Sequence, residues 1–322
     1  MTSKEKYRKL CAEEPSIPIY SRDWWLDAVA PGAWDVVTVE KNEEIVAALP
    51  YVIQKHYGFT HICMPSLTQK LGPWLKYPAG QKYSKKLDYE KKTFNELIEK
   101  LPAVDAFNQN FDYRIENWLP FYWQGFSQST RYTYVIPDLT DVDKVYADLA
   151  SDIRNQLRKS EKLVSCEVTE DVDLLYDVAK KTFVRQNMQI PYSREFLHRL
   201  VEATKAHSAG RIYVAKDREN RVHAVSFLIW DENSAYYLIG GADPELRQSS
   251  AQVALMWRMI QDSAKVTRSF DFEGTMLPTV NRTFRNFATV QYPYFNISKT
   301  YNKRLKGLQH VKEILRILRG QN

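Results

Sequence analysis

An acidic residue directly after a short apolar segment is the strongest candidate for chemistry in this sequence. Residues 269–272 have the alternation of a short strand, and Glu273 follows them. Ligands and catalytic groups gather at strand ends in mixed α/β sheets, so Glu273 is a candidate catalytic residue. An acid in this place also caps the start of a following helix, and this segment alone leaves both interpretations open.

A second candidate is the corner between a buried strand and a helix. Residues 236–241 predict a strand that ends in the pair Gly240 and Gly241, and a helical pattern begins near Gln248, just after Arg247. Free backbone N–H groups at such a helix start form a ready anion site. Many corners of this kind bind nothing, so the pattern marks a candidate only.

Two groups of polar residues add to these candidates. Arg154, Arg158 and Lys162 recur every four residues and predict a basic ridge on one helix face. The ridge fits the phosphates of a nucleotide-linked or tRNA-linked substrate, or else it is a solvated face. Arg185 and Gln186 follow an apolar helical run, where they either position an acceptor or satisfy the helix C-terminus.

The elements that position these residues occur twice. Residues 20–23, 36–53 and 123–136 match residues 192–195, 212–229 and 284–297 in the same order, with small insertions or deletions between them. We interpret the chain as two copies of one α/β unit, with domains at residues 1–140 and 141–322. Asp105 aligns with Asp271, so Phe107 holds the position of Glu273. The second copy is therefore the catalytic candidate, and the first is structural or clamps the substrate.

The composition is that of an ordinary globular protein. Hydrophobic residues make up 44% of the chain and charged residues 26%, and the net charge of +6 is modest. No apolar stretch is long enough to span a bilayer, and the N-terminus lacks the apolar core of a signal peptide. Three scattered cysteines suit a reducing compartment, so we expect a cytoplasmic protein. We expect no metal, because no histidine has ligand spacing, and no DNA partner.

The C-terminal segment, residues 302–322, predicts a basic amphipathic helix. Its apolar stripe comprises Leu305, Leu308, Val311, Leu315 and Leu318. We expect this stripe to pack on its own domain rather than on a membrane surface.

Several of these segments together resemble one protein family. Residues 269–295, the helix at 151–162 and the repeated strand–turn–strand units are similar to the FemAB-like branch of the GNAT acyltransferase superfamily, over nearly the whole chain. The resemblance implies two tandem GNAT-like domains, each an α/β fold with a mixed, largely antiparallel sheet flanked by helices. It also implies transfer of an acyl or aminoacyl group from a thioester or a tRNA ester to an amine.

The resemblance also assigns roles to residues. In GNAT-type domains two neighbouring parallel strands splay apart around the donor carbonyl. In this chain the two strands would be residues 236–241, which include Gly240, and residues 269–273. Glu273 is then the candidate base that takes the ammonium proton. Tyr237 or a backbone N–H near Ile239 would face the oxyanion or the leaving group.

One departure from the family pattern concerns the donor. The family's coenzyme A loop has the pattern Gln/Arg-x-x-Gly-x-Gly/Ala, whereas this chain has Arg247, Gln248, Ser249, Ser250 and Ala251 and lacks both glycines. A serine adds a Cβ where backbone must approach a pyrophosphate. The donor stays open between acyl-CoA and aminoacyl-tRNA, and no cofactor is assigned. The alternative is a non-catalytic binding protein with a decayed GNAT cleft that recognises a nucleotide, peptide or glycan.

Overall fold

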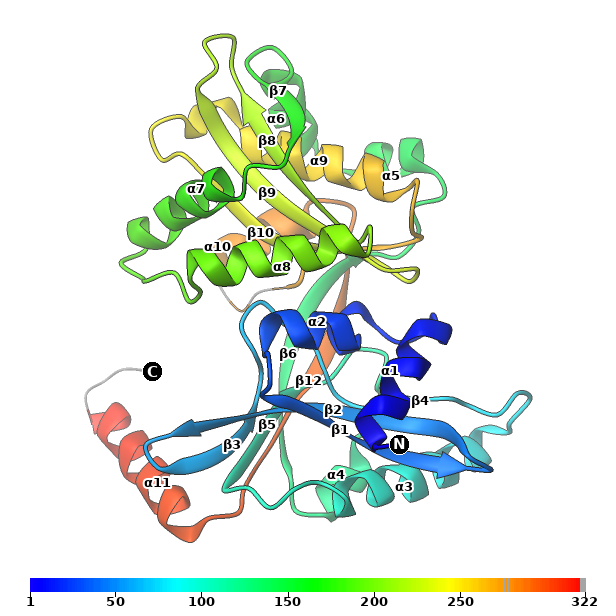
Figure 1. The fold of residues 1–322 in the computed structure, drawn as a ribbon. Helices are drawn as coiled ribbons and strands as arrows, with labels where there is room; N and C mark the ends of the chain where they lie inside the picture. Colours follow the sequence, from blue (N-terminus) through cyan, green and yellow to red (C-terminus); the bar gives the residue numbers. More distant parts are fainter. Residues whose placement is uncertain (275, 277, 319–322) are drawn as a thin grey trace. The chain divides into compact units, whose positions relative to one another are not determined.

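The computed structural model describes residues 1–274, 276 and 278–318, and these form two compact units (Figure 1). The first unit comprises Met1–Glu13, Ala30–Arg131 and Tyr294–Asn322, and the second comprises Glu14–Val29 and Tyr132–Pro293. The chain therefore alternates between the units. The domain boundary at residue 140 stays a prediction. The compact units are divided differently, because Glu14–Val29 belongs to the second unit and Tyr294–Asn322 belongs to the first.

The first unit is built around one sheet with the strand order β1-β2-β3-β5-β12. Its strands are β1 (Trp34–Lys41), β2 (Glu44–His56), β3 (Phe59–Cys63), β4 (Trp74–Leu75), β5 (Ala106–Asn110) and the ends of β6 (Ser127–Ile136) and β12 (Val290–Thr300). Its helices are α1 (Ser3–Glu13), α3 (Tyr83–Glu99), α4 (Leu119–Trp123) and α11 (Lys303–Leu318). The pairing is antiparallel except between β3 and β5, so the sheet is mixed as predicted.

The second unit has the strand order β6-β11-β10-β9-β8-β7. These strands are the rest of β6, β7 (Ser165–Thr169), β8 (Gly210–Lys216), β9 (Val222–Trp230), β10 (Ala235–Ala242) and β11 (Phe270–Asp271). The α-helices are α2 (Asp23–Val29), α5 (Val142–Asp148), α6 (Ser151–Ser160), α7 (Val172–Arg185), α8 (Arg194–Ala206), α9 (Ala251–Ser263) and α10 (Pro278–Arg285). Two 3₁₀ turns, η1 (Ile19–Ser21) and η2 (Arg247–Ser249), complete it.

Local sequence signals account for several element boundaries. The side chains of Asp171 and Ser193 accept hydrogen bonds from backbone N–H groups of the first turns of α7 and α8, as N-cap residues do. Asn42 and Asn220 take left-handed backbone conformations in the turns of the β1–β2 and β8–β9 hairpins. The predicted strand–turn–strand units are therefore confirmed.

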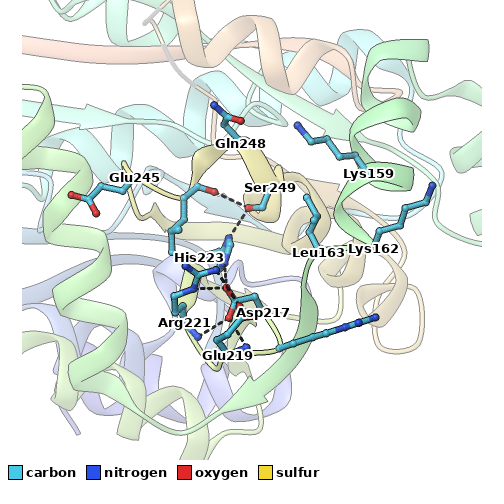
Figure 2. A pocket seen from close by; sticks show the side chains of 12 residues that line it. Lys159, Lys162, Leu163, Asp217, Glu219, Arg221, His223, Glu245, Gln248 and Ser249 are labelled. Carbon is cyan, nitrogen blue, oxygen red and sulfur yellow. Dashed lines mark hydrogen bonds and ion pairs between the residues drawn. The ribbon is translucent and has the colours of Figure 1, made fainter.

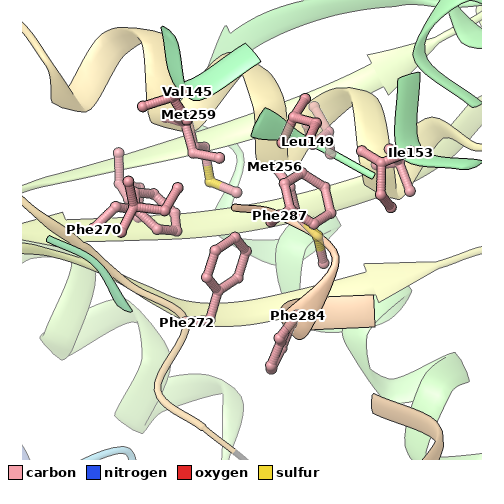
Figure 3. Close-up of a cluster of buried hydrophobic side chains, with 14 of the residues drawn as sticks. Val145, Leu149, Ile153, Met256, Met259, Phe270, Phe272, Phe284 and Phe287 are labelled. Carbon is pink, nitrogen blue, oxygen red and sulfur yellow. The ribbon is translucent and has the colours of Figure 1, made fainter. Parts of the chain in front are cut away.

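The core of the second unit lies where α5, α6 and α9 cover one face of the sheet (Figure 3). Phe270 and Phe272 enter this core from β11 and the residue after it, and Phe272 packs 4.9 Å from Phe284 and 5.3 Å from Phe287, ring centre to ring centre. Phe284 and Phe287 are three residues apart, which is the spacing of residues on one side of a helix. Both are buried, although α10 ends at Arg285 and Phe287 follows it.

The C-terminal helix α11 corrects one expectation. Its apolar side chains Leu308, Val311 and Leu315 are 58%, 55% and 48% exposed. The expectation that this stripe packs on its own domain is wrong for these three residues. The side chain of Leu318 and residues 319–322 lie outside the part of the chain that the structure describes. Among the described helices, none has the length and the apolar character needed to cross a membrane.

Candidate active site

The strands β10 and β11 pair in parallel for only two residues. Ala235 pairs with Phe270 and Tyr236 pairs with Asp271, and the parallel pairing ends there. β10 continues along β9 to Ala242, whereas the backbone N–H of Phe272 donates to the carbonyl of Tyr134 on β6. Each strand thus keeps its other neighbour after the pairing between β10 and β11 has ended. We call this place the strand parting.

A bulge in β10 lies at the strand parting. The register with β9 shifts between Tyr237 and Ile239, so Leu238 is the extra residue. A bulge disrupts the ladder locally and redirects backbone groups. The predicted oxyanion donor near Ile239 therefore falls in a stretch where the backbone leaves its regular pairing.

Glu273 lies immediately beyond the strand parting and is only 9% exposed. Its φ of +65° places it in the left-handed region, which is unusual for a residue with a side chain. Its backbone N–H donates to the buried Asp271 carboxylate at 2.8 Å, and the Thr133 hydroxyl donates to the same carboxylate oxygen. Asp271 therefore holds the backbone turn that directs Glu273, and Glu273 is a buried acid rather than a solvated helix cap.

Gly274 allows the chain to turn this tightly. It also has a positive φ, of +62°, and a Cβ built on it would lie 2.0 Å from the carbonyl oxygen of Tyr132. Only glycine permits this close approach to β6.

Tyr20 is a neighbour of Glu273 that the sequence reasoning missed. It belongs to the Glu14–Val29 segment of the second unit, and its ring centre lies 5.2 Å from that of Tyr236 and 5.1 Å from that of Trp25. Burial raises the pKa of Tyr20 well above its usual value, and the nearby Glu273 carboxylate raises it further. The Tyr20 hydroxyl therefore stays protonated beside this carboxylate. The sequence signalled Tyr20 only as the first residue of a repeated block.

Tyr237, the other candidate catalytic residue, is held by hydrogen bonds on the opposite side of β10. Gln252 Nε2, at the start of α9, donates to the Tyr237 hydroxyl and to Ser226 Oγ, both at 2.7 Å. A Cβ on Gly240 would lie 1.6 Å from the Tyr237 hydroxyl oxygen, so the absence of a side chain there makes room for it. Burial raises the pKa of Tyr237 above its usual value, and the phenol keeps its proton at neutral pH.

The two candidate catalytic side chains therefore face different sides of the sheet. Neighbouring residues of a strand point to opposite faces. Tyr236 packs with Tyr20, which adjoins Glu273, whereas Tyr237 packs with Phe272 and Phe284 on the face that α9 covers. The strand parting lies between the two groups.

The loop between β10 and α9 retains a glycine-like backbone. Ser250 has a φ of +58° and precedes the first residue of α9. The Ser249 hydroxyl is buried, where it donates to the Leu246 carbonyl and contacts a ring nitrogen of His223 at 2.9 Å. Arg247 is exposed. Of the residues predicted to bind a donor here, Arg247 faces solvent, and Ser249 supports the loop from within.

The predicted basic ridge is divided in the structure. The Arg154 guanidinium donates to the carbonyls of Ala147 and Leu149, and the exposed Arg158 donates to Asn155. Arg154 therefore closes the end of α5. Lys162 follows α6 and lines a pocket of about 480 Å³ that Gln248 and Ser249 of the β10–α9 loop also line (Figure 2).

Arg185 and Gln186 end α7 and are both exposed. Arg185 lines a pocket of about 530 Å³ with Lys181 and Asp243, which form an ion pair at 2.6 Å. Asp243 follows β10 directly, so Arg185 lies across from the end of that strand. The Gln186 backbone N–H donates to the Phe183 carbonyl as the helix ends.

The first unit contains a matching pair of strands whose parting is filled. β3 and β5 also pair in parallel at two positions only, His61 with Ala106 and Ile62 with Phe107. Beyond them, Leu71 donates to the Asn110 carbonyl at 2.7 Å, and the Asn110 side chain donates to the Gln69 carbonyl at 3.0 Å. The chain itself thus occupies this place in the first unit.

Comparison with protein-family models matches residues 147–276 to the acetyltransferase (GNAT) domain. The second unit carries a GNAT domain. No curated protein matches the sequence of this chain.

Solved structures extend the likeness to nearly the whole chain. FemX is 12% identical, with 96% of this chain and 98% of FemX covered at a TM-score of 0.69. The C-terminal domain of a putative lysylphosphatidylglycerol synthetase from Agrobacterium fabrum is 13% identical, with 87% and 88% covered at 0.52. A tandem GNAT protein from the clavulanic acid biosynthesis pathway is 11% identical, with 91% and 93% covered at 0.50.

These likenesses establish the fold. The mixed α/β fold with flanking helices is confirmed, and so is the resemblance of residues 147–276 to the GNAT superfamily; the fold of the chain is similar to that of FemX. The family match is to the acetyltransferases of the GNAT type and applies to residues 147–276. None of the comparisons supports the non-catalytic alternative.

Proposed function

We propose that this chain is an N-acyltransferase that moves an acyl or aminoacyl group, from an acyl-CoA or an aminoacyl-tRNA, to an amine at the strand parting of the second unit. The observation that carries the proposal is the two-residue parallel pairing of β10 and β11, which ends beside the buried Glu273. The parting gives a donor carbonyl access to the backbone of both strands, and the bulge in β10 redirects that backbone there.

The opposite faces of the sheet suggest how the reaction is arranged. The amine approaches on the face of Glu273, which takes one proton as the nitrogen attacks the acyl carbon. Backbone N–H groups near Ile239 stabilise the oxyanion that forms. The bond from the acyl carbon to sulfur or oxygen then breaks. Tyr237, whose raised pKa leaves the phenol protonated at neutral pH, donates its proton to the leaving group on the other face of the sheet. The new amide and a thiol or a ribose hydroxyl are the products.

The first unit has a supporting role in this proposal. Its own strand parting is filled by residues 69–71, so it offers no equivalent place for a donor. We infer that it is structural or clamps the substrate. Cys11, Cys63 and Cys166 are free, which suits a reducing compartment such as the cytoplasm.

Thermal unfolding with acetyl-CoA, free coenzyme A or charged tRNA tests the choice of donor. A ligand that binds the native state at a hundred times its Kd adds about 2.7 kcal/mol of stability, so the true donor raises the Tm. Product release in the presence of a panel of amines then measures transfer. Glu273→Gln should keep the donor-dependent Tm shift and lose transfer by on the order of a hundredfold.

Two results would contradict this function. If none of the three donors stabilises the protein, the strand parting is not a donor site. If Glu273→Gln transfers at the native rate, Glu273 is not the base. Glu202→Gln, an isosteric change at an exposed acid on α8, serves as the matched control.

A further inference from the structure

One side of the helix α11, in the first unit, is apolar and exposed. Leu308, Val311 and Leu315 recur at three- and four-residue spacing, so they lie on one side of the helix. Their side chains are 58%, 55% and 48% exposed, and among the side chains that the structure describes, none from α11 enters the hydrophobic core of the first unit. We call these three residues the apolar face. Apolar side chains gathered at the surface mark an interaction site.

Basic side chains border the apolar face. Residues 302–322 contain six basic residues and one acidic residue. Those that the structure describes on α11 as exposed are Lys303, Arg304, Lys306 and Lys312. Arg304 stands four residues before Leu308 and Lys312 four residues after it, so both lie next to the apolar face along the helix. Such side chains lay their methylene stems along an apolar surface while the charged ends reach anions beside it.

Hydrogen bonds to Asp105 fix the start of α11 beside the turn between β2 and β3 (Figure 1). One carboxylate oxygen of Asp105 accepts from the Asn302 side-chain amide at 2.6 Å. The other accepts from the Thr60 backbone N–H at 2.7 Å and from the Thr60 hydroxyl at 2.9 Å. The Asp105 carbonyl also accepts from the backbone N–H groups of Tyr301 and Asn302. The first residues of β3 and of α11 therefore meet at one end of the sheet.

The β2–β3 turn adds an exposed aromatic residue at this end of the sheet. Tyr57 stands three residues before Thr60 and is 99% exposed, and Lys55 and His56 before it are exposed too. A tyrosine has an apolar ring and a polar hydroxyl, which suits the boundary between water and the acyl chains of a membrane. Apolar, aromatic and basic side chains are thus present together at this end.

The charge of this surface distinguishes between the partners that an apolar face attracts. A second copy of the chain would bring an equally basic helix against the first, and like charges at short distance repel. An anionic bilayer offers an apolar boundary for Leu308, Val311 and Leu315 and negative charge for the basic side chains around them. Amphipathic helices that lie on membrane surfaces combine the same two features.

We propose that α11 and the β2–β3 turn bind the surface of a bilayer that contains anionic phospholipid. The helix lies in the plane of the headgroups, with the apolar face toward the acyl chains and the basic side chains on the lipid phosphates. Tyr57 enters the headgroup layer beside it. This surface belongs to the first unit and does not depend on the transfer reaction proposed for the second.

Co-sedimentation of the whole protein with lipid vesicles tests the proposal. Vesicles of equal parts phosphatidylglycerol and phosphatidylcholine should bind the protein, and vesicles of phosphatidylcholine alone should bind it far more weakly. Higher ionic strength should weaken the binding, because exposed charges are screened.

A double variant measures the contribution of the apolar face. Leu308→Gln with Val311→Gln should lower the affinity for the anionic vesicles by on the order of tenfold, because two apolar side chains no longer leave water on binding. The Tm should stay native, since both positions are exposed. Val168→Gln with Val266→Gln is the matched control, at exposed apolar positions of the second unit, and it should bind like the native protein.

A second double variant measures the contribution of charge. Lys303→Gln with Lys312→Gln should lower the affinity about fivefold for each charge removed. Lys144→Gln with Lys205→Gln removes the same charge from exposed positions on α5 and α8, and it should leave vesicle binding close to native.

The outcomes separate a membrane-binding surface from general charge attraction. Loss of affinity in both α11 variants, with both controls near native, supports the proposal. No binding of anionic vesicles by the native protein overturns it, and so does native binding by Leu308→Gln with Val311→Gln or an equal loss in the controls. Sedimentation velocity without lipid adds one arm. A dimer that this variant dissociates, in a protein that binds no vesicles, would assign the apolar face to a second copy. Donor stabilisation and amine transfer test the proposed function separately.

Discussion

The candidate base occupies a backbone conformation that its residue type disfavours. A left-handed conformation costs an L-residue roughly 1–2 kcal/mol, and such strain gathers at functional sites. At Glu273 the Asp271 carboxylate offsets part of this cost by accepting the Glu273 N–H. The sequence pointed to Glu273 through its place after a strand, but φ depends on the contacts of Asp271 and Gly274 with β6 and follows from the tertiary structure.

Tyr20→Phe tests whether the neighbouring phenol tunes Glu273. The protonated hydroxyl lies beside the carboxylate, and a hydrogen-bond donor stabilises the ionised form of an acid. Without the hydroxyl, the acidic limb of the pH profile of kcat/KM should move to higher pH. The buried ring remains, so the Tm should change little. The measurement is transfer rate against pH for the native protein and the variant.

A matched change separates this effect from packing. Tyr192→Phe removes the hydroxyl of another buried tyrosine in the same unit. It should leave the acidic limb in place. If Tyr20→Phe folds normally and the acidic limb of its kcat/KM profile stays at the native pH, the role of Tyr20 is limited to packing against Tyr236 and Trp25.

Among the elements, the loop from β10 to α9 shows what a sequence pattern can and cannot reveal. Counted from Arg247, Ser250 stands where the family's coenzyme A loop has its first glycine, and its φ of +58° is one that glycine adopts freely. The pattern predicted a changed loop. The structure shows that the backbone conformation persists and that the serine side chain is the difference.

Ser250→Gly should therefore stabilise the protein. Removal of the unfavourable left-handed conformation of serine should raise the free energy of unfolding by roughly 1–2 kcal/mol. The greater conformational freedom of glycine in the unfolded chain should lower it by roughly 0.5–1 kcal/mol. The net gain of about 0.5–1 kcal/mol is measurable by denaturant unfolding. Ser249→Gly is the contrasting change, because it removes the buried hydroxyl that joins Leu246 and His223, and it should destabilise by about 1 kcal/mol. The opposite order of stability would contradict this account of the loop.

The hairpins and strand ends were predictable because their signals are local. Alternating apolar residues and polar turns identify β1–β2 and β8–β9, and the acid after an apolar segment identifies Glu273. Tyr20 was not predictable as a site residue. Tyr20 lies beside Glu273 only because the segment Glu14–Val29 packs into the second unit, whose other residues come more than a hundred positions later in the sequence. The position of the Arg154 side chain was not predictable for a similar reason. Its spacing predicted an exposed basic ridge, whereas in the structure its guanidinium donates hydrogen bonds to carbonyls at the end of α5.

For the whole molecule, the path of the chain decides which pieces fold. The second unit needs Glu14–Val29, which supplies the buried Tyr20 and Trp25. This segment is fixed by hydrogen bonds from Arg199 Nε to the Ala28 carbonyl at 2.7 Å and from the Ile19 N–H to Asp231 at 2.8 Å. It also needs the second part of β6, because β11 pairs with it at Phe270 and Asp271. A cut at the predicted boundary of residue 140 removes both.

A fragment of residues 141–293 should therefore fail to unfold cooperatively. A chain that joins residues 14–29 through a flexible linker to residues 132–293 should regain a single cooperative transition, because each fully buried aromatic side chain contributes about 2–3 kcal/mol. Circular dichroism during urea unfolding measures this for both fragments. Trp25→Ala in the linked chain is the control, and it should abolish the gain while the linker stays intact. Cooperative unfolding of the short fragment by itself would show that Glu14–Val29 and β6 contribute little to the second unit, and Tyr20 would then lose its claim to a fixed place beside Glu273.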